Sequence, residues 1–145
     1  MSKFKLHITT VVMVLVSIFA LAGCGDSAGA PRINGLAPDA VVRTVFNEVQ
    51  TNHLSDAKEY LAPNTTGDNS SIQAMKNSNL ISVKTLANQG DYAVVVATMQ
   101  QQNSTNFSVK PVGLEKINGE WYILDLNNIY NNAKYSVLQK LLGNI

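Results

Sequence analysis

Cys24 is the residue whose type and surroundings point most directly to chemistry. It is the only cysteine among 145 residues, and it comes directly after Ala22 and Gly23. A single cysteine excludes a disulfide within one chain and a cysteine-rich metal site. A buried structural thiol is not expected either, because the small and polar residues from Gly25 to Gly29 give no apolar core. We therefore expect this thiol to be modified or free.

The residues before Cys24 have the three parts of an export signal. Lys3 and Lys5 form a basic start, the stretch 8–19 is uncharged and apolar, and small residues precede the cysteine. The apolar stretch is shorter than the about 20 residues that a permanent membrane-spanning helix needs. Residues 1–23 are therefore predicted to be a removable signal peptide.

The string Leu21-Ala22-Gly23-Cys24 resembles the lipobox of bacterial lipoproteins. The resemblance implies that the thiol of Cys24 receives a diacylglyceryl group, and that a signal peptidase cuts between Gly23 and Cys24. Two acyl chains such as palmitate give stable anchoring, since each buried methylene contributes roughly 0.8 kcal/mol. The expected location is the cell envelope, on the extracytoplasmic side of a bacterial membrane. The alternative is an ordinary secretory signal that leaves Cys24 as a free thiol.

A second group of residues has side chains suited to acid–base catalysis. Asp125 is expected near the end of a strand, where it could act as a buried base or, more simply, cap the strand end. Tyr92 and Tyr122 could donate hydrogen bonds to a substrate, although tyrosines with a buried ring and an accessible hydroxyl are common in cores. We expect no catalytic site and keep these three residues as weak candidates.

Metal and cofactor chemistry lack their usual parts. Of the two histidines, His7 belongs to the predicted signal, and His53 lies between two predicted helices, where a turn residue is expected. One histidine without cysteines does not form a typical zinc site or a catalytic triad. Gly113, Gly119 and Gly143 are isolated, so no glycine-rich phosphate loop is present. The sequence predicts no metal and no cofactor.

The charge pattern argues against nucleic acid as a partner. The chain has a formal net charge of +1 at pH 7, and loss of Lys3 and Lys5 leaves the exported part near neutral. Its remaining lysines and arginines are spread singly among acids, without the basic clusters that nucleic acid binding needs. Roughly 120 exported residues are sufficient for one domain with its own core. The expected partners are the membrane through the lipid anchor, and an envelope protein, a wall component or a small ligand.

Three parts follow one another along the chain: the signal at 1–23, the modified cysteine and a flexible tether at 24–37, and a domain at 38–145. The tether is rich in glycine and contains Pro31. Its roughly 13 residues would span on the order of 20 Å, which keeps the domain close to the membrane.

Helices are predicted first in the domain. Asp39 is expected to cap the first helix, in which apolar residues recur at helical spacing from Val41 to Val49. Ser55 is expected to cap a short second helix that Pro63 ends. A polar loop and a third short helix follow.

Four strands are predicted after these helices, from segments rich in β-branched and aromatic residues: Leu80–Ala87, Tyr92–Met99, Phe107–Ile117 and Trp121–Leu126. Asn118-Gly119 favours a tight type I′ hairpin between the last two. Pro111 cannot donate to a strand ladder, so its strand is expected at an edge or bent, with Gly113 allowing a bulge. Apolar residues alternate onto both sides of the last strand, so both faces of the sheet need cover.

A C-terminal helix is predicted after Asn127-Asn128, with a stripe formed by Tyr130, Ala133, Val137 and Leu141. We expect this helix to cover the second face of the sheet. A dimer contact through the helix is the alternative. A helix lying on a membrane is less favoured, because two lysines make a poor basic face.

The order of these elements, with four strings of residues, resembles lipoproteins of the nuclear transport factor two-like superfold. The strings are Ala37–Phe46, Leu54–Leu61, Gly90–Val96 and Leu114–Ile123. The resemblance implies a cystatin-like α+β domain of unknown function. N-terminal helices would pack on a curved, mainly antiparallel sheet of about four strands, here with an added C-terminal helix.

The same superfold includes isomerases and dehydratases that use a pocket carboxylate or histidine with a tyrosine. A pocket enzyme acting on a small apolar substrate is therefore the alternative that the resemblance implies. Because none of the candidates in this chain lies in a matching motif, we expect a non-catalytic binding or interaction domain.

Overall fold

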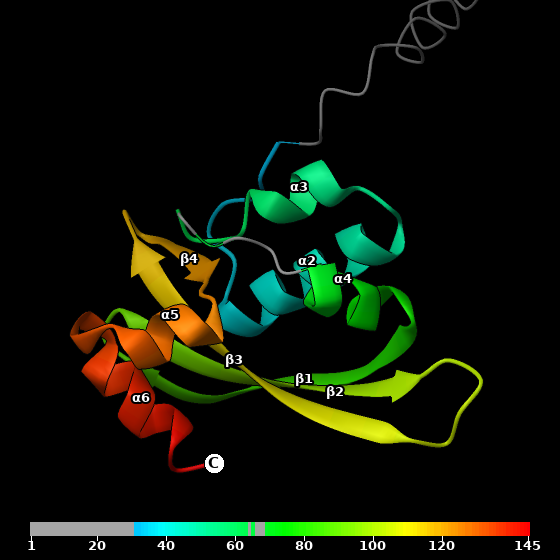
Figure 1. The fold of residues 1–145 in the computed structure, drawn as a ribbon. Helices are drawn as coiled ribbons and strands as arrows, with labels where there is room; N and C mark the ends of the chain where they lie inside the picture. Colours follow the sequence, from blue (N-terminus) through cyan, green and yellow to red (C-terminus); the bar gives the residue numbers. More distant parts are fainter. Residues whose placement is uncertain (1–30, 64, 66–68) are drawn as a thin grey trace, which may run out of the picture.

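The computed structural model describes residues 31–145 except 64 and 66–68, so the predicted signal, Cys24 and most of the tether lie outside the described residues. Its elements are α2 (Pro38–Gln50), α3 (Leu54–Lys58), α4 (Asn69–Lys76), β1 (Ser78–Gln89), β2 (Tyr92–Gln101), β3 (Phe107–Ile117), β4 (Glu120–Ile123), α5 (Leu126–Asn131), the 3₁₀ turn Ala133–Tyr135 and α6 (Ser136–Leu142). The strands form one antiparallel sheet in the order β1-β2-β3-β4. Helices lie on both sides of this curved sheet (Figure 1), which confirms the expected α+β fold class.

Helix α2 covers one face of the sheet. Its buried side chains recur three or four residues apart, so they form a single stripe along the helix. The stripe packs on buried residues of the strands, among them Val95, Leu114 and Trp121. This is the larger of the two apolar clusters among the described residues, and it forms because the helical and strand periodicities each place their apolar residues on the facing side.

The helix starts differ from the expected caps. Helix α2 begins at Pro38, whose missing N–H costs nothing in the first turn, and Asp39 lies inside that turn rather than at the cap. Helix α3 begins at Leu54, and Ser55 donates a hydrogen bond to Asp56 instead of capping the helix. Both cap predictions were wrong. Asp39 and Ser55 each lie inside the first turn of their helix, and neither side chain caps it.

The strands agree closely with the predicted segments, except that β4 ends at Ile123 rather than at Leu126. It ends there because Asp125 is the N-cap of α5, which begins at Leu126. The hairpin between β3 and β4 has positive φ at both Asn118 (52°) and Gly119 (88°), as a type I′ turn requires.

Pro111 lies at an edge of the sheet, as expected. It pairs with Val96 of β2, whereas β4 pairs with β3 only from Leu114 onward, so no strand pairs with β3 on its other side at the proline. The two irregularities of the ladder lie in β1 rather than at Gly113, so the predicted bulge was wrong. Gly113 serves a close approach instead: a Cβ atom there would lie 2.5 Å from Cδ1 of Ile129 in α5.

The C-terminal helices cover part of the second face of the sheet, as we expected for this segment. Ile129 and Leu138 are fully buried and pack with Val94 of β2. The predicted stripe was wrong, since Tyr130 and Ala133 are exposed and Tyr135 is buried. The reason is that the 3₁₀ turn separates α5 from α6 and shifts which residues face the sheet.

The cover on this second face is incomplete. Side chains alternate along β3, so Phe107, Val109 and Pro111 share the face of Gly113, away from α2. Phe107 and Val109 are 62% and 61% exposed. Figure 1 shows α5 and α6 gathered at the β4 end of the sheet, and the far end of β2 and β3 extending beyond them. We call these three residues the open apolar face.

We predict that Gly113→Ala lowers the free energy of unfolding by about 1–2 kcal/mol, because the added methyl group meets Ile129 and Leu138 in a packed core. Chemical denaturation followed by circular dichroism measures this loss. Gly143→Ala is the matched control, since the nearest atom to its added Cβ is 3.4 Å away. Equal stability of the two variants would show that α5 does not pack tightly on the sheet.

Candidate functional site

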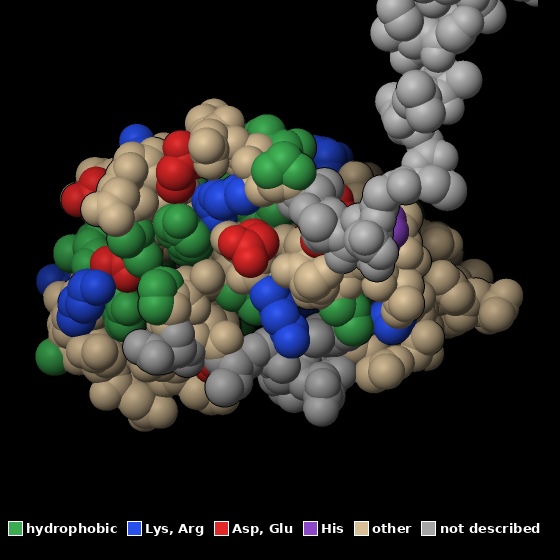
Figure 2. All heavy atoms as spheres, turned by 90° about the horizontal axis from the view of Figure 1, so that it is seen from above, with side chains coloured by type: hydrophobic (Ala, Val, Ile, Leu, Met, Phe, Trp, Pro, Cys, Tyr) green, Lys and Arg blue, Asp and Glu red, His purple; other side chains and the backbone are tan. Residues whose placement is uncertain are grey.

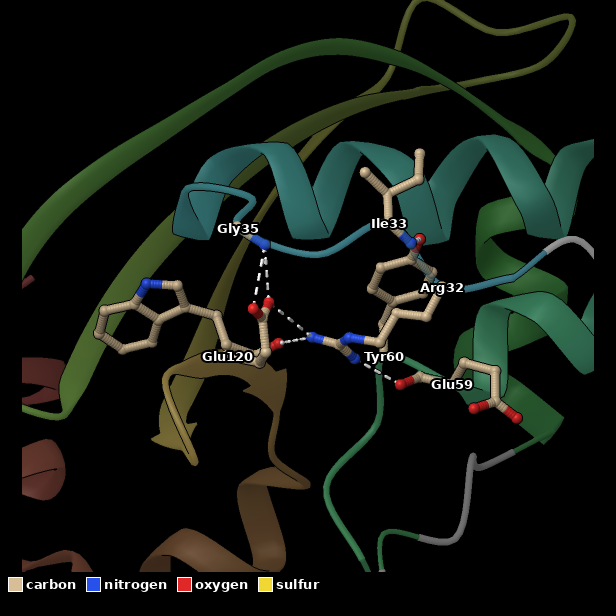
Figure 3. Close-up of polar contacts among 7 residues, drawn as sticks. Arg32, Ile33, Gly35, Glu59, Tyr60 and Glu120 are labelled. Carbon is tan, nitrogen blue, oxygen red and sulfur yellow. Dashed lines mark hydrogen bonds and ion pairs between the residues drawn. The ribbon is translucent and has the colours of Figure 1, made fainter.

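The densest set of polar contacts surrounds Arg32, which lies in the segment before α2. The centre of its guanidinium is 4.7 Å from the ring centroid of Tyr60 and 4.1 Å from that of Tyr122. Its nitrogens donate to the backbone carbonyls of Glu59 and, at 2.7 Å, of Trp121. Figure 3 shows the Arg32 side chain lying between the residues that follow α3 and strand β4. We call Arg32 with these contacts the Arg32 clamp.

Two further contacts hold the same segment. Glu120 of β4 lies 3.9 Å from the guanidinium and accepts hydrogen bonds from the backbone N–H of Gly35, at 3.1 and 2.9 Å. The hydroxyl of Tyr60 accepts from the backbone N–H of Ile33 at 3.0 Å (Figure 3). The Arg32 side chain is only 12% exposed. A cation this buried is tolerated because two aromatic faces, two carbonyls and a carboxylate replace most of its water, while its Nε has no hydrogen-bond partner among the described residues.

The clamp changes the expected nature of the tether. The described part, from Pro31 to Ala37, was expected to be flexible, yet it is fixed to the domain by Arg32, Ile33 and Gly35 and by Leu36, which packs on the core. The chain therefore enters the domain at a defined place, between α3 and β4. Sequence reasoning missed this, because a single arginine in a segment rich in glycine and proline has no periodic pattern.

Tyr122 and Asp125, two of the weak catalytic candidates, have structural contacts. Tyr122 provides one of the two rings against Arg32. Asp125 is the N-cap of α5: its Oδ1 accepts from the N–H groups of Asn127 at 2.7 Å and Asn128 at 3.4 Å. Its carboxylate is thus engaged in the capping role that the sequence favoured.

Tyr92, the third candidate, belongs to a polar cluster beneath the C-terminal helices. Its ring meets that of Tyr135 edge to face, with centroids 6.2 Å apart. Tyr135 donates to the buried carboxylate of Glu115 at 3.2 Å, and Nζ of Lys134 lies 2.6 Å from the other oxygen. We call Glu115, Lys134 and Tyr135 the Glu115 cluster. Sequence reasoning missed this cluster, because a glutamate next to Lys116 at a strand end resembles a solvated residue.

The electrostatics of this cluster favour the ion pair. The hydrogen bond to Glu115 raises the pKa of Lys134 above its ordinary value of 10.5, and burial opposes this effect. Burial, followed by the nearby Glu115 charge, raises the pKa of Tyr135 above its ordinary value of 10.0. With its lysine and tyrosine in place, Glu115 has both oxygens occupied. The cluster therefore ties the 3₁₀ turn to β3.

The structure does not bring the candidates Asp125, Tyr92 and Tyr122 into one site. Each takes part in a different set of contacts: a helix cap, an aromatic pair and the Arg32 clamp. His53, which was expected in a turn, precedes α3 and lies beside Glu48. Tyr92 and Tyr122 both pack against the apolar cluster under the C-terminal helices, but their polar and aromatic contacts are with different partners.

The surface on the helix side has no single sign of charge. Figure 2 looks down on this face, and acidic and basic side chains lie next to one another on its described part. No helix in the described ranges combines the length and apolar composition that a membrane crossing requires. Comparison with models of known protein families found no match for the chain, and a search among curated proteins found none.

We predict that Arg32→Ala lowers the free energy of unfolding by about 2–3 kcal/mol, because two carbonyls lose a charged donor and a carboxylate loses its ion-pair partner. Hydrogen exchange at the amides of Ile33 and Gly35 should become faster at the same time. Arg43→Ala is the matched control, since Arg43 is exposed on α2. Unchanged exchange at both amides in Arg32→Ala would mean that the clamp does not hold the segment.

We predict that stability falls at alkaline pH through the Glu115 cluster. Lys134 and Tyr135 keep their protons to higher pH in the folded chain than in the unfolded chain. The free energy of unfolding that they contribute is therefore present below pH 10.0 and is lost as the pH rises through their folded pKa values. The double variant Lys134→Met/Tyr135→Phe should be less stable at neutral pH and show a flatter decline above pH 10.0, measured by urea denaturation. Lys140→Met should keep the original slope. Equal slopes for all three proteins would refute the assignment.

Proposed function

We propose that this protein is a bacterial lipoprotein, anchored through Cys24 on the extracytoplasmic side of a membrane, whose domain acts by binding a partner and not by catalysis. The anchoring part rests on the export signal and the string Leu21-Ala22-Gly23-Cys24. The observation that carries the proposal is the Arg32 clamp, because it fixes the chain to the domain only eight positions after Cys24.

This short separation limits how far the domain can lie from the lipid. A segment from Cys24 to Arg32 spans at most about 28 Å when fully extended. The clamp lies between α3 and β4, so this side of the domain would face the membrane. In Figure 1 the described chain enters beside α3, whereas the C-terminal helices and the face of the sheet away from α2 lie on the opposite side.

The contacts of the candidate residues support binding over the enzyme alternative. Asp125 is committed to a helix cap, and Tyr122 to the guanidinium of Arg32. The open apolar face offers a contrasting feature, since Phe107 and Val109 expose apolar side chains that a partner would remove from water. It lies away from the proposed membrane side, which suits an envelope protein or a wall component.

The nuclear transport factor two-like family remains part of this proposal. Its support is the order of elements, in which helices are followed by a four-stranded antiparallel sheet. The C-terminal helices are an addition to the superfold, and they cover the sheet where Ile129 and Leu138 meet Gly113. Cover at this place leaves less room for a ligand between the sheet and solvent.

We predict that Cys24→Ala moves the protein from the detergent-requiring membrane fraction to the soluble exported or precursor pool, because the acyl chains are lost. Cell fractionation and labelling with a fatty-acid analogue measure this. Ser27→Ala, which changes a residue outside the lipobox, should behave like the native protein. Membrane association that persists in Cys24→Ala, together with an unlabelled native protein, would defeat the lipoprotein proposal.

A further inference from the structure

Glu48, His53 and Asp56 bring three ligand atoms together at the corner between α2 and α3. Glu48 lies in the last turn of α2, His53 directly precedes α3, and Asp56 lies in the first turn of α3. One nitrogen and two carboxylate oxygens from these residues all lie within 4.8 Å of one another. We call these three residues the corner cluster.

The backbone of the corner holds these side chains in place. The N–H of His53 donates to the carbonyl of Glu48 at 2.8 Å, and the N–H of Asp56 donates to the carbonyl of His53 at 3.1 Å. Asn52 makes the sharp turn between them with a φ of 66°. Because the three residues are linked through consecutive backbone hydrogen bonds, the arrangement does not depend on a long loop.

Two of the ligand atoms form a hydrogen bond in this structure, and their separation also suits two ligands of one metal ion. Nδ1 of His53 lies 3.3 Å from Oε2 of Glu48. Ligands about 2.0–2.2 Å from a tetrahedral zinc ion lie about 3.3 Å from one another. A carboxylate oxygen of Asp56, within 4.8 Å of the ligand atoms of Glu48 and His53, would be the third protein ligand. Three ligands leave a fourth position for water.

The charge and the burial of the corner cluster also favour a metal ion. Two carboxylates and a neutral imidazole carry two negative charges, which a divalent cation offsets. Asp56 is 9% exposed, and the side chains of Glu48 and His53 are 26% and 64% exposed. The corner cluster is therefore walled on the aspartate side and open on the histidine side, where an ion could enter.

The hydroxyl groups of Ser55 and Thr51, next to the corner cluster, are compatible with a bound metal ion. Ser55 donates to Oδ1 of Asp56 at 3.1 Å, and Oγ1 of Thr51 lies 3.3 Å from Nδ1 of His53. A carboxylate oxygen can accept a hydrogen bond and bind a metal with different lone pairs. The Thr51 hydroxyl also bonds to the carbonyl of Asn47, so it can remain in place when His53 binds a metal.

We propose that the corner cluster binds one divalent transition-metal ion of the zinc type. Imidazole nitrogen with carboxylate oxygen favours such ions over calcium or magnesium, which prefer all-oxygen sites. The sequence predicted no metal site because one of its two histidines lies in the predicted signal and it has a single cysteine. Folding supplies the two carboxylates that complete the set.

The test measures zinc binding by titration calorimetry on the full-length chain in detergent. All the proteins compared carry Cys24→Ser and His7→Ala, which remove the single thiol and the imidazole that lies outside the corner cluster. We expect one equivalent of Zn²⁺ to bind and to raise the melting temperature by several degrees. Co²⁺ should give a visible absorption spectrum. His53→Ala and Asp56→Asn should each weaken Zn²⁺ binding at least tenfold, and Glu59→Gln, at the residue that follows the same helix, should not.

Three results would overturn the proposal. They are no saturable Zn²⁺ binding by protein that is folded by circular dichroism, equal Zn²⁺ affinity in His53→Ala, and binding of Ca²⁺ or Mg²⁺ in preference to Zn²⁺. His53 is exposed, so His53→Ala should fold, and His53→Gln offers a second, more conservative variant. Failure here leaves the lipid-anchor proposal untouched, because Cys24 labelling is measured separately.

Discussion

The structure depends on β4, a four-residue strand that lies between two apolar clusters. Trp121 and Ile123 belong to the cluster under α2, whereas Tyr122 on the other side of the strand belongs to the cluster under the C-terminal helices. Strand residues alternate between faces, so one short strand can join both clusters. With a single cysteine in the chain, no disulfide shares this task, and packing on both faces must hold the domain together.

The small size of β4 has two consequences for the surface. Because it pairs with only the last part of β3, the sheet has a free edge at Pro111, and the proline offers no N–H there to another strand. Because α5 follows β4 almost at once and crosses close to Gly113, the C-terminal helices settle at that end of the sheet. Phe107 and Val109, at the far end, remain exposed.

Polar clusters connect elements that the apolar clusters do not fix in orientation. The Arg32 clamp joins the entering chain to β4, and the Glu115 cluster joins the 3₁₀ turn to β3. Each contains one charged side chain that is mostly removed from water, Arg32 in the clamp and Glu115 in the Glu115 cluster, and such groups require specific partners at specific distances. This demand sets the direction in which the chain leaves the domain, and with it the face that a lipid-anchored protein would turn towards the membrane.

The sequence by itself predicted most of the elements, and it has the pattern expected of an export signal. Apolar spacing in α2, alternation in the strands and the Asn118-Gly119 turn are local, so each could be predicted from neighbouring residues. Only the tertiary structure decided the sites. The hydrogen bond from Arg32 to Trp121 joins residues 89 positions apart, and no local pattern records such a contact. The phase of the C-terminal helices was likewise decided by packing, since their fit against Gly113 and Val94 selects which side chains are buried.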